Sequence, residues 1–115
     1  MKKKINSRQK GASGERELAA FLREHGYEAR RGVQFSGSPD SPDVVTDFPF
    51  HVECKRTEAL SIYKALAQAS RDAGDQTPLV CHRRSRQEWV AILKLEDLIT
   101  ILKGKNDGET ETETT

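Results

Sequence analysis

The stretch "DVVTDFPFHVECKR", residues 43–56, restricts the possible folds of this chain more than any other segment. Two runs rich in β-branched and aromatic residues flank a turn-forming cluster at Asp47–Pro49. Such a pattern predicts two antiparallel strands joined by a tight connection. Because side chains alternate between the two faces of a strand, Glu53 and Lys55 are expected on one face. The apolar residues next to them are expected to face the core.

Helical and strand-like patterns alternate through the rest of the chain. Apolar residues recur at intervals of three and four in three segments, which predicts helices in residues 13–26, 57–74 and 95–104. Three further short apolar runs predict strands in residues 27–33, 77–84 and 88–93. The expected order is therefore α-β-β-β-α-β-β-α, an α/β fold in which helices pack on a mixed sheet.

Capping residues and apolar spacing predict the ends and the buried faces of the helices. The expected cap and stop residues are Ser13, Gly26, Thr57, Gly74 and Gly104. The expected buried stripes are Leu18, Phe21, Leu22 and His25 in the first helix, Ala59, Ile62, Leu66, Ala69 and Ala73 in the second, and Leu95, Leu98, Ile99 and Leu102 in the third. Two aromatic residues are expected to join the core, Tyr63 and Trp89.

The composition fits one small domain with a modest core, because 35% of the 115 residues are hydrophobic and 32% are charged. No apolar run approaches the length of a membrane span, and the basic start "MKKK" lacks the apolar segment of a signal peptide. The two cysteines, Cys54 and Cys81, lie in strand-like runs. We therefore expect a cytoplasmic protein without a membrane partner, in which both thiols are reduced and buried.

The net charge of +1 is unevenly distributed along the chain. Residues 1–35 carry nine Lys and Arg against four Glu, a net charge of +5, whereas residues 104–115 carry one Lys against four acidic residues. We expect a flexible basic arm at 1–10, a folded domain at 11–103 and a disordered acidic tail at 104–115. The basic N-terminal region is compatible with a polyanionic partner such as DNA.

Two acidic residues, Asp43 and Glu53, are expected to face each other across the hairpin. If its turn is centred on Phe48, opposed residues have numbers that add up to 96, and this register pairs them. Directly opposed carboxylates are close enough to reach one ion. Asp40 lies beyond this pair, behind Pro42, which cannot donate a hydrogen bond to a sheet. Asp43 is therefore the preferred ligand and Asp40 the alternative, although a register shift of one residue would move Asp43 to the other face.

The chemistry expected of this acidic pair is metal-dependent hydrolysis of a phosphate ester. Neighbouring carboxylates repel each other unless a cation lies between them. Oxygen ligands suit a hard ion such as Mg²⁺ or Mn²⁺, and the backbone carbonyl of Cys54 could add another oxygen. Such an ion polarises a phosphate and activates water, while Lys55 would orient that water or stabilise transition-state charge. The alternative without a function is a solvated Glu–Lys pair on an open sheet face.

The spacing of these residues, Pro42-Asp43, nine residues and then Glu53-Cys54-Lys55, resembles the PD-(D/E)xK nuclease signature. The segments "KGASGERELAAFLREHGY" and "FSGSPDSPDVV" resemble the first helix and the Ser-Gly loop of archaeal Holliday junction resolvases. The segments "ECKR", "YKALAQA" and "TPLVCHRR…EWVAIL" are similar to small phage-encoded nucleases of the same superfamily. The resemblance covers residues 10–102.

The resemblance implies a restriction-endonuclease-like αβββαβ core and a set of site residues. The implied metal ligands are Glu15, Asp43, Glu53 and the backbone carbonyl of Cys54. The implied catalytic residues are Glu15, Asp43, Glu53, Lys55 and Gln68, the last of which would support the site from the second helix. The implied DNA contacts are Lys10, Arg16, Arg30, Arg31, Ser36 and Arg56.

Glu15 has a competitor in Glu17, because both residues border the packed face of the first helix. Glu15 precedes Leu18 and Leu22 by three and seven residues, and Glu17 precedes Phe21 by four. Only the resemblance favours Glu15. Each residue could also be a favourable acidic residue in the first turn of a helix.

The remaining polar candidates are weaker. Three histidines share no common spacing and are expected to be structural: His25, His51 and His82. The segment "HRRSRQ", residues 82–87, could be a basic hairpin that meets DNA or a solvated turn.

These features together predict a metal-dependent DNA endonuclease of phage or prokaryotic type. The resemblance implies a structure-specific resolvase that acts on branched DNA, the four-way Holliday junction. It also implies a homodimer, because two strands are cut symmetrically. Two alternatives remain open. One is a repair, recombination or restriction-like nuclease that cuts flaps, nicks or duplex DNA, and the other is a nuclease-fold DNA-binding protein without a catalytic role.

Overall fold

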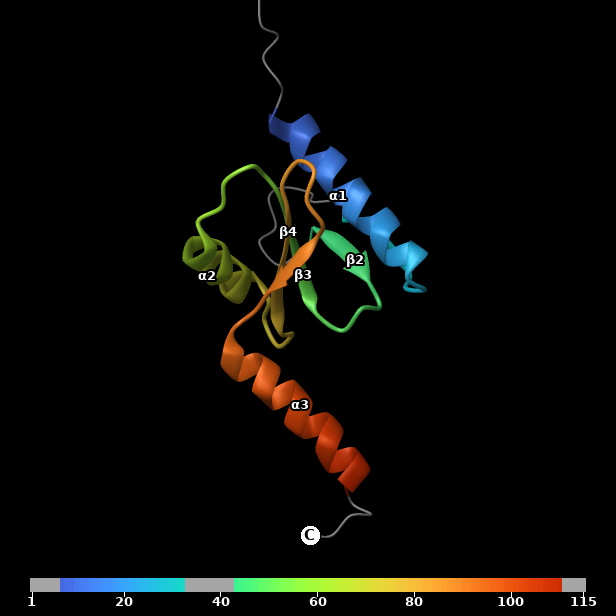
Figure 1. The fold of residues 1–115 in the computed structure, drawn as a ribbon, viewed down its shortest axis with the longest axis vertical. Helices are drawn as coiled ribbons and strands as arrows, with labels where there is room; N and C mark the ends of the chain where they lie inside the picture. Colours follow the sequence, from blue (N-terminus) through green and yellow to red (C-terminus); the bar gives the residue numbers. More distant parts are fainter. Residues whose placement is uncertain (1–6, 33–42, 111–115) are drawn as a thin grey trace, which may run out of the picture.

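The computed structural model describes residues 7–32 and 43–110, with side chains for 11–32 and 43–104. Its helices and strands are, in chain order, α1 (Ser7–Glu24), β1 (Ala29–Arg31), β2 (Val44–Thr46), β3 (His51–Arg56), α2 (Ile62–Asp72), β4 (Pro78–Arg83), β5 (Val90–Ile92) and α3 (Leu95–Thr110). This succession confirms the expected order of helices and strands (Figure 1).

The five strands form one mixed sheet in the order β1-β2-β3-β4-β5. β3 and β4 run parallel because α2 forms a crossover between them, and the other neighbouring strands are antiparallel. In the β2–β3 pair, Val44 lies opposite Val52, which is the register expected from a turn centred on Phe48. The predicted α/β fold is therefore confirmed, and it is consistent with a restriction-endonuclease-like core.

α1 and α2 cover opposite faces of this sheet (Figure 1). Leu79 and Cys81 of β4 pack in the core under α1, whereas Val80 between them packs against Ala65 and Ala69 of α2. Alternate residues of a strand point in opposite directions, so the two helices bury different sides of the same strand. The sheet thus separates two small cores.

α1 begins at Ser7, well before the cap expected at Ser13, so the predicted start of this helix was wrong. Its buried side chains are Ala12, Leu18, Ala19 and Leu22. Phe21 and His25, which were expected in the buried stripe, are exposed. The side of α1 that faces the sheet therefore includes Ala12 and Ala19. These small side chains, together with a glycine, let the helix lie close to the sheet.

That glycine, Gly14, lies against β3. A Cβ atom at this position would lie 2.6 Å from Cβ of Arg56 and 3.6 Å from Sγ of Cys54. The first distance is far too short for two carbon atoms, and Cβ of Arg56 cannot move without its backbone. Glycine therefore sets the separation of α1 and β3, and with it the position of the next residue, Glu15.

α2 begins at Ile62 with Ser61 at the N-cap position, so the cap expected at Thr57 was wrong. The hydroxyl of Thr57 instead donates to the carbonyl oxygen of Ala59 at 2.8 Å, which holds this segment in a turn before the helix. At the other end, Gly74 has φ of +59° just after the helix, and the predicted stop is confirmed.

α3 passes the stop expected at Gly104 and ends at Thr110. A single glycine weakens a helix by about 1 kcal/mol but does not have to end it. Trp89 packs at the edge of the core under α1 as expected, whereas Tyr63 is 86% exposed and does not join a core. Within residues 7–32 and 43–110, no helix is both long and apolar enough to cross a membrane.

Candidate active site

Glu53 lies in the middle of β3 and is almost fully buried, at 3% exposed. His51, two residues earlier on the same strand, is 1% exposed. Both side chains point to the α2 side of the sheet, because Val52 between them packs in the core under α1. Nε2 of His51 lies 3.1 Å from Oε1 of Glu53, within hydrogen-bonding distance. The buried carboxyl group is thus held at one of its oxygens.

Asp43 directly precedes β2 and meets Glu53 in the predicted register. Its Oδ2 accepts a hydrogen bond from the backbone N–H of Cys54 at 2.9 Å. Burial, the charge of Asp43 and a hydrogen bond between the two carboxyl groups raise the pKa of Glu53 from 4.5 to about 8. Carboxyl groups this close favour sharing a proton or a cation. The structure therefore brings together the two acids that the sequence pairs.

Lys55 and Gln68 form the next contact along the same face of β3. Nζ of Lys55 donates a hydrogen bond to Oε1 of Gln68 on α2 at 3.0 Å. The positive charge of Lys55 also acts on Glu53 and favours its ionised form. α2 therefore fixes the direction of a lysine that lies beside a buried acid.

Glu15 approaches Asp43 from α1, which covers the face of the sheet opposite to α2. Its Oε1 accepts a hydrogen bond from Nε of Arg31 at 2.8 Å. Burial is the main cause that raises the pKa of Glu15, and the nearby charge of Asp43 adds to it, whereas Arg31 opposes the rise. Glu15 is therefore close enough to Asp43 for the two negative charges to repel each other, while Arg31 partly neutralises the charge of Glu15.

Glu17, the competitor of Glu15, is held in a different set of contacts. Its Oε1 accepts hydrogen bonds from Nε of Arg56 at 3.2 Å and from Nη1 of Arg83 at 2.6 Å. These contacts join α1 to the ends of β3 and β4. Because two arginines neutralise this carboxylate, a structural role explains it, and Glu15 becomes the better candidate for the site.

The donor set around Asp43 and Glu53 fits a hard divalent cation. Two carboxyl groups lie side by side next to the backbone of Cys54, and Mg²⁺ is commonly held by one or two carboxylates together with substrate phosphates and water. Among the described residues, no group of three or more His, Cys, Asp and Glu side chains is arranged to hold an ion. Glu15 thus stands next to the acidic pair without completing a three-residue cluster.

The cysteine side chains do not add to this donor set. Cys54 and Cys81 are both free, as expected, with Cys81 buried and Cys54 partly buried. Burial raises the pKa of the Cys81 thiol to about 12 and also raises that of Cys54. Both thiols therefore remain protonated at neutral pH, a state in which they are poor ligands and nucleophiles.

The structure describes the side chains of only some of the predicted DNA contacts. The side chains of Arg16, Arg30 and Arg31 are exposed, and Arg31 carries the contact to Glu15. Arg56 is engaged by Glu17 and lies 3.8 Å from Glu58. The side chains of Lys10 and Ser36, and the alternative ligand Asp40, lie outside the described residues.

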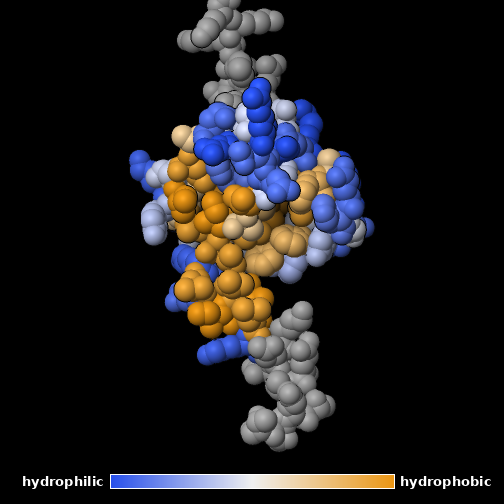
Figure 2. Space-filling model, in the orientation of Figure 1, coloured by the Kyte–Doolittle hydropathy of each residue, from blue (hydrophilic) through white to orange (hydrophobic). Residues whose placement is uncertain are grey.

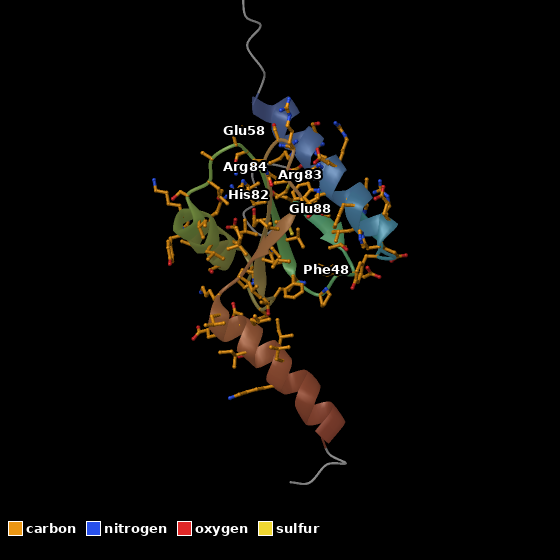
Figure 3. All side chains as sticks on the ribbon, in the orientation of Figure 1. Phe48, Glu58, His82, Arg83, Arg84 and Glu88 are labelled. Carbon is orange, nitrogen blue, oxygen red and sulfur yellow. The ribbon has the colours of Figure 1, made fainter. Side chains whose placement is uncertain are left out.

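The segment 82–87 forms the turn between β4 and β5. The backbone N–H and the hydroxyl of Ser85 both donate to Oε2 of Glu58, at 2.9 and 2.7 Å. Figure 3 shows Glu58, Arg83 and Arg84 together at the end of the sheet near the start of α1, whereas Phe48 lies at the opposite end. The turn is thus fixed by an acidic residue, and Arg84 remains exposed on it.

Sequence reasoning missed the contacts of two residues, His51 in the site and Glu17 beside it. His51 was expected to have a structural role only, yet it contacts the carboxyl group of Glu53. The strand alternation that placed Glu53 and Lys55 on one face also includes His51, two residues earlier, so the signal was present. The contacts of Glu17 with Arg56 and Arg83 could not be read in this way, because they join three separate elements.

Comparison with known proteins identifies the family of the chain. The model of the family described as "Phage putative PDDEXK endonuclease" matches residues 6–115. No curated protein and no solved structure matches the chain significantly. The family match includes α1, the whole sheet and the acidic pair on β2 and β3. The chain therefore belongs to this family of phage PDDEXK endonucleases.

Proposed function

We propose that the protein is a metal-dependent endonuclease that hydrolyses phosphodiester bonds of DNA. The observation that carries this proposal is the pair of partly buried Asp43 and buried Glu53 next to Lys55, in a chain of an endonuclease family. Burial of an ionisable carboxyl group lowers the stability of the fold, and strongly raised pKa values of this kind cluster at functional sites. Binding a cation is the purpose that suits two adjacent acids.

Asp43 and Glu53 would hold the ion, with the carbonyl oxygen of Cys54 as a further ligand and Glu15 as the acidic residue from α1. Mg²⁺ is the proposed ion, and Mn²⁺ the alternative with the same preference for oxygen. When bound, such a cation reduces the negative charge of the scissile phosphate and lowers the pKa of the attacking water. Binding it also removes the repulsion between the two acids.

Lys55 and Gln68 would act on the reacting groups from the α2 side. Lys55 carries a positive charge that can stabilise the developing charge of the transition state or orient the attacking water. Gln68 accepts a hydrogen bond from the same ammonium group and so restricts its position. The expected products carry a 5′-phosphate and a 3′-hydroxyl, as a result of in-line attack on the phosphodiester.

DNA would be bound mainly through phosphates, by the exposed arginines Arg16, Arg30 and Arg31, together with Lys10, Ser36 and Arg56. Such binding weakens steeply as the salt concentration rises. The segments similar to archaeal resolvases favour branched DNA, above all the four-way junction. The enzyme would meet this substrate in the cytoplasm of a prokaryotic or phage-infected cell, during DNA recombination or repair.

A homodimer is part of this proposal, because symmetric cleavage of two strands needs two active sites related by a two-fold axis. A nuclease that acts on flaps, nicks or duplex DNA would use the same residues, and one active site could serve it. A nuclease-fold protein that only binds DNA would have no use for the adjacent acids Asp43 and Glu53 and their lysine.

The test compares cleavage of a four-way junction, a flap and a linear duplex in Mg²⁺, each with and without EDTA. The proposal predicts Mg²⁺-dependent cleavage, fastest on the junction, with paired cuts in opposing strands. Faster cleavage of flaps or duplex would select the alternative nuclease. Binding of all three substrates without cleavage, by protein shown to be folded, would select the non-catalytic alternative and overturn the proposal.

A further inference from the structure

The exposed apolar stripe on α3 is the most unusual surface of the described chain. Leu95, Leu98, Ile99 and Leu102 recur at positions i, i+3, i+4 and i+7 and therefore share one side of the helix. All four are exposed, Leu95 at 69% and Leu102 at 50%. A soluble helix normally buries such a stripe, so this side of α3 is built to be covered.

The stripe continues onto the body of the protein. A groove of about 780 Å³ runs between α2 and the start of α3, and Ile62, Tyr63, Leu66 and Leu95 line it. Tyr63 at its rim is 86% exposed and Ile62 is 47% exposed. Figure 2 shows the hydrophobic colour passing without a break from α3 onto this part of the surface. Apolar patches that exceed a few hundred Å² on a protein surface mark interaction sites.

We propose that this surface is a self-association face, on which α3 packs against α3 of a second copy in an antiparallel, two-fold arrangement. The four stripe residues of each helix would form the centre of the interface. Because the helices run in opposite directions, the far part of one α3, at Leu102, would lie at the groove beside Ile62 and Tyr63 of the other copy. Each copy therefore provides both a helix and a groove.

The charges on α3 favour a second copy in this orientation. Glu96, near the start of the helix, and Lys103, seven residues later, lie on the same flank of the apolar stripe. In an antiparallel two-fold pair, this flank of one helix lies beside the same flank of the other. Glu96 of each copy is then next to Lys103 of its partner, which gives two opposite-charge contacts.

A parallel pair would not satisfy these charges. It places this flank of one helix beside the opposite flank of its partner, so Glu96 of one copy does not meet Lys103 of the other. The apolar stripe is symmetric about its own centre, between Leu98 and Ile99, so reversing the partner preserves apolar contact along its whole length. The apolar stripe is therefore compatible with the antiparallel arrangement, and the charges favour it.

This inference assigns the interface of the homodimer that is part of the proposed function. Only the connection between the dimer and DNA cleavage rests on that proposed function. Association can be measured without DNA or metal, for example by sedimentation equilibrium of the full-length chain in EDTA. We expect a monomer–dimer equilibrium. A chain that stays monomeric at every accessible concentration overturns the inference, whatever its nuclease activity. A dimer without cleavage activity would instead support the inference and count against the proposed function.

The apolar centre is tested by Leu98→Glu, with Thr100→Glu as a matched control on the opposite side of α3. Leu98→Glu places a charge in the interface of both copies, and we expect the dimer dissociation constant to rise roughly 30-fold or more. Thr100→Glu should leave it unchanged. Circular dichroism shows whether each variant is folded. A folded Leu98→Glu variant that dimerises as the wild type does would overturn the inference.

The orientation is tested by exchanging the two charges. Lys103→Glu and Glu96→Lys should each weaken the dimer about 2- to 10-fold at low salt, because each leaves like charges side by side. The double variant Glu96→Lys/Lys103→Glu restores the opposite-charge contacts and should restore wild-type association. A different protein as the natural occupant would give no such rescue in the isolated chain. Absence of rescue would overturn the antiparallel arrangement.

Discussion

The two faces of β3 meet opposite requirements in neighbouring residues. Val52 and Cys54 face α1 and help to form an apolar core, whereas His51, Glu53 and Lys55 face α2 and place polar groups in almost the same degree of burial. The first face stabilises the fold through apolar contact. The second face opposes folding, because burial raises the pKa of an acid to about 8. One strand thus supplies both the stability and the chemistry of this small domain.

The difference shows how the site can exist in a chain of 115 residues. Parallel pairing of β3 with β4 holds the strand on one side, and pairing with β2 brings Asp43 from the other. The backbone that carries Glu53 is therefore held by neighbouring strands and by its apolar face. The polar face does not need to contribute stability, and its side chains are available for function.

The largest effect is expected from a substitution that changes the polar face of β3 and leaves its apolar face intact. Glu53→Gln removes a proposed metal ligand while keeping the size of the side chain. We expect cleavage to fall about 10²- to 10³-fold, because charge stabilisation at the phosphate is lost. The measurement is single-turnover cleavage of a junction in Mg²⁺. Glu88→Gln, an exposed acid elsewhere, is the control and should cleave at the wild-type rate.

The same substitution makes a prediction about stability and pH in the absence of metal. The pKa of Glu53 is about 8 when folded and 4.5 as a reference, so the folded state holds its proton more tightly. The proton on Glu53 therefore contributes its full stabilisation below pH 4.5, and this contribution to the free energy of unfolding is lost as the pH rises toward 8. Urea unfolding in EDTA should show this decline, and Glu53→Gln should remove it. An equal decline in both proteins would contradict the buried acid.

Val52→Ala instead removes apolar contacts on the face of β3 that packs against α1. Val52 is fully buried, and truncation should lower the free energy of unfolding by about 1.5–3 kcal/mol. Cleavage measured at a temperature where the variant is folded should remain near the wild-type rate. Val45→Ala on the exposed side of β2 is the matched control, for which we expect less than about 0.5 kcal/mol. A large loss of activity in folded Val52→Ala protein would show that the two faces are not separable.

His51 sharpens the comparison, because it is buried on the polar face and touches Glu53 at one oxygen only. His51→Leu should weaken Mn²⁺ binding about 10- to 100-fold, since the carboxyl group loses the contact that orients it. His51→Gln can still donate a hydrogen bond and should bind Mn²⁺ more tightly than His51→Leu. Isothermal titration with Mn²⁺ measures both. If the two variants bind equally well, His51 only fills space.

The smallest effect concerns the helix that covers the apolar face. Gly14→Ala should destabilise the protein by about 1–2 kcal/mol, because its Cβ would collide with β3 at Arg56. Gly11→Ala in the same helix meets nothing within 4 Å and should stabilise it by up to about 1 kcal/mol. Thermal unfolding of the two variants gives the contrast directly. Equal and positive shifts in both would show that α1 does not lie close to β3.

The polar face could largely be predicted from the sequence, because it depends on local periodicity. Alternation placed Glu53 and Lys55 together, and the expected register paired Val44 with Val52, next to Asp43. Gln68 was named from resemblance, and it does meet Lys55. Such relationships follow from the geometry of a strand and of a hairpin, which a short sequence fixes.

The helices were predicted less well, because their buried faces and ends depend on partners that are distant in the sequence. Phe21 was assigned to the buried stripe of α1 by its apolar character, but close contact through Gly14 turns the helix toward smaller residues. Tyr63 was assigned to the core by the same reasoning and is exposed. Periodicity shows that a helix has an apolar side, but not what covers that side.

The central claim is that Asp43, and not Asp40, pairs with Glu53 to bind the ion. The most direct measurement is Mn²⁺ binding by isothermal titration to the wild type, Asp43→Asn and Asp40→Asn, all without DNA. We predict one site in the wild type and in Asp40→Asn, and loss of that site in Asp43→Asn with the fold retained. Wild-type affinity in Asp43→Asn, or loss of binding in Asp40→Asn alone, would contradict the claim.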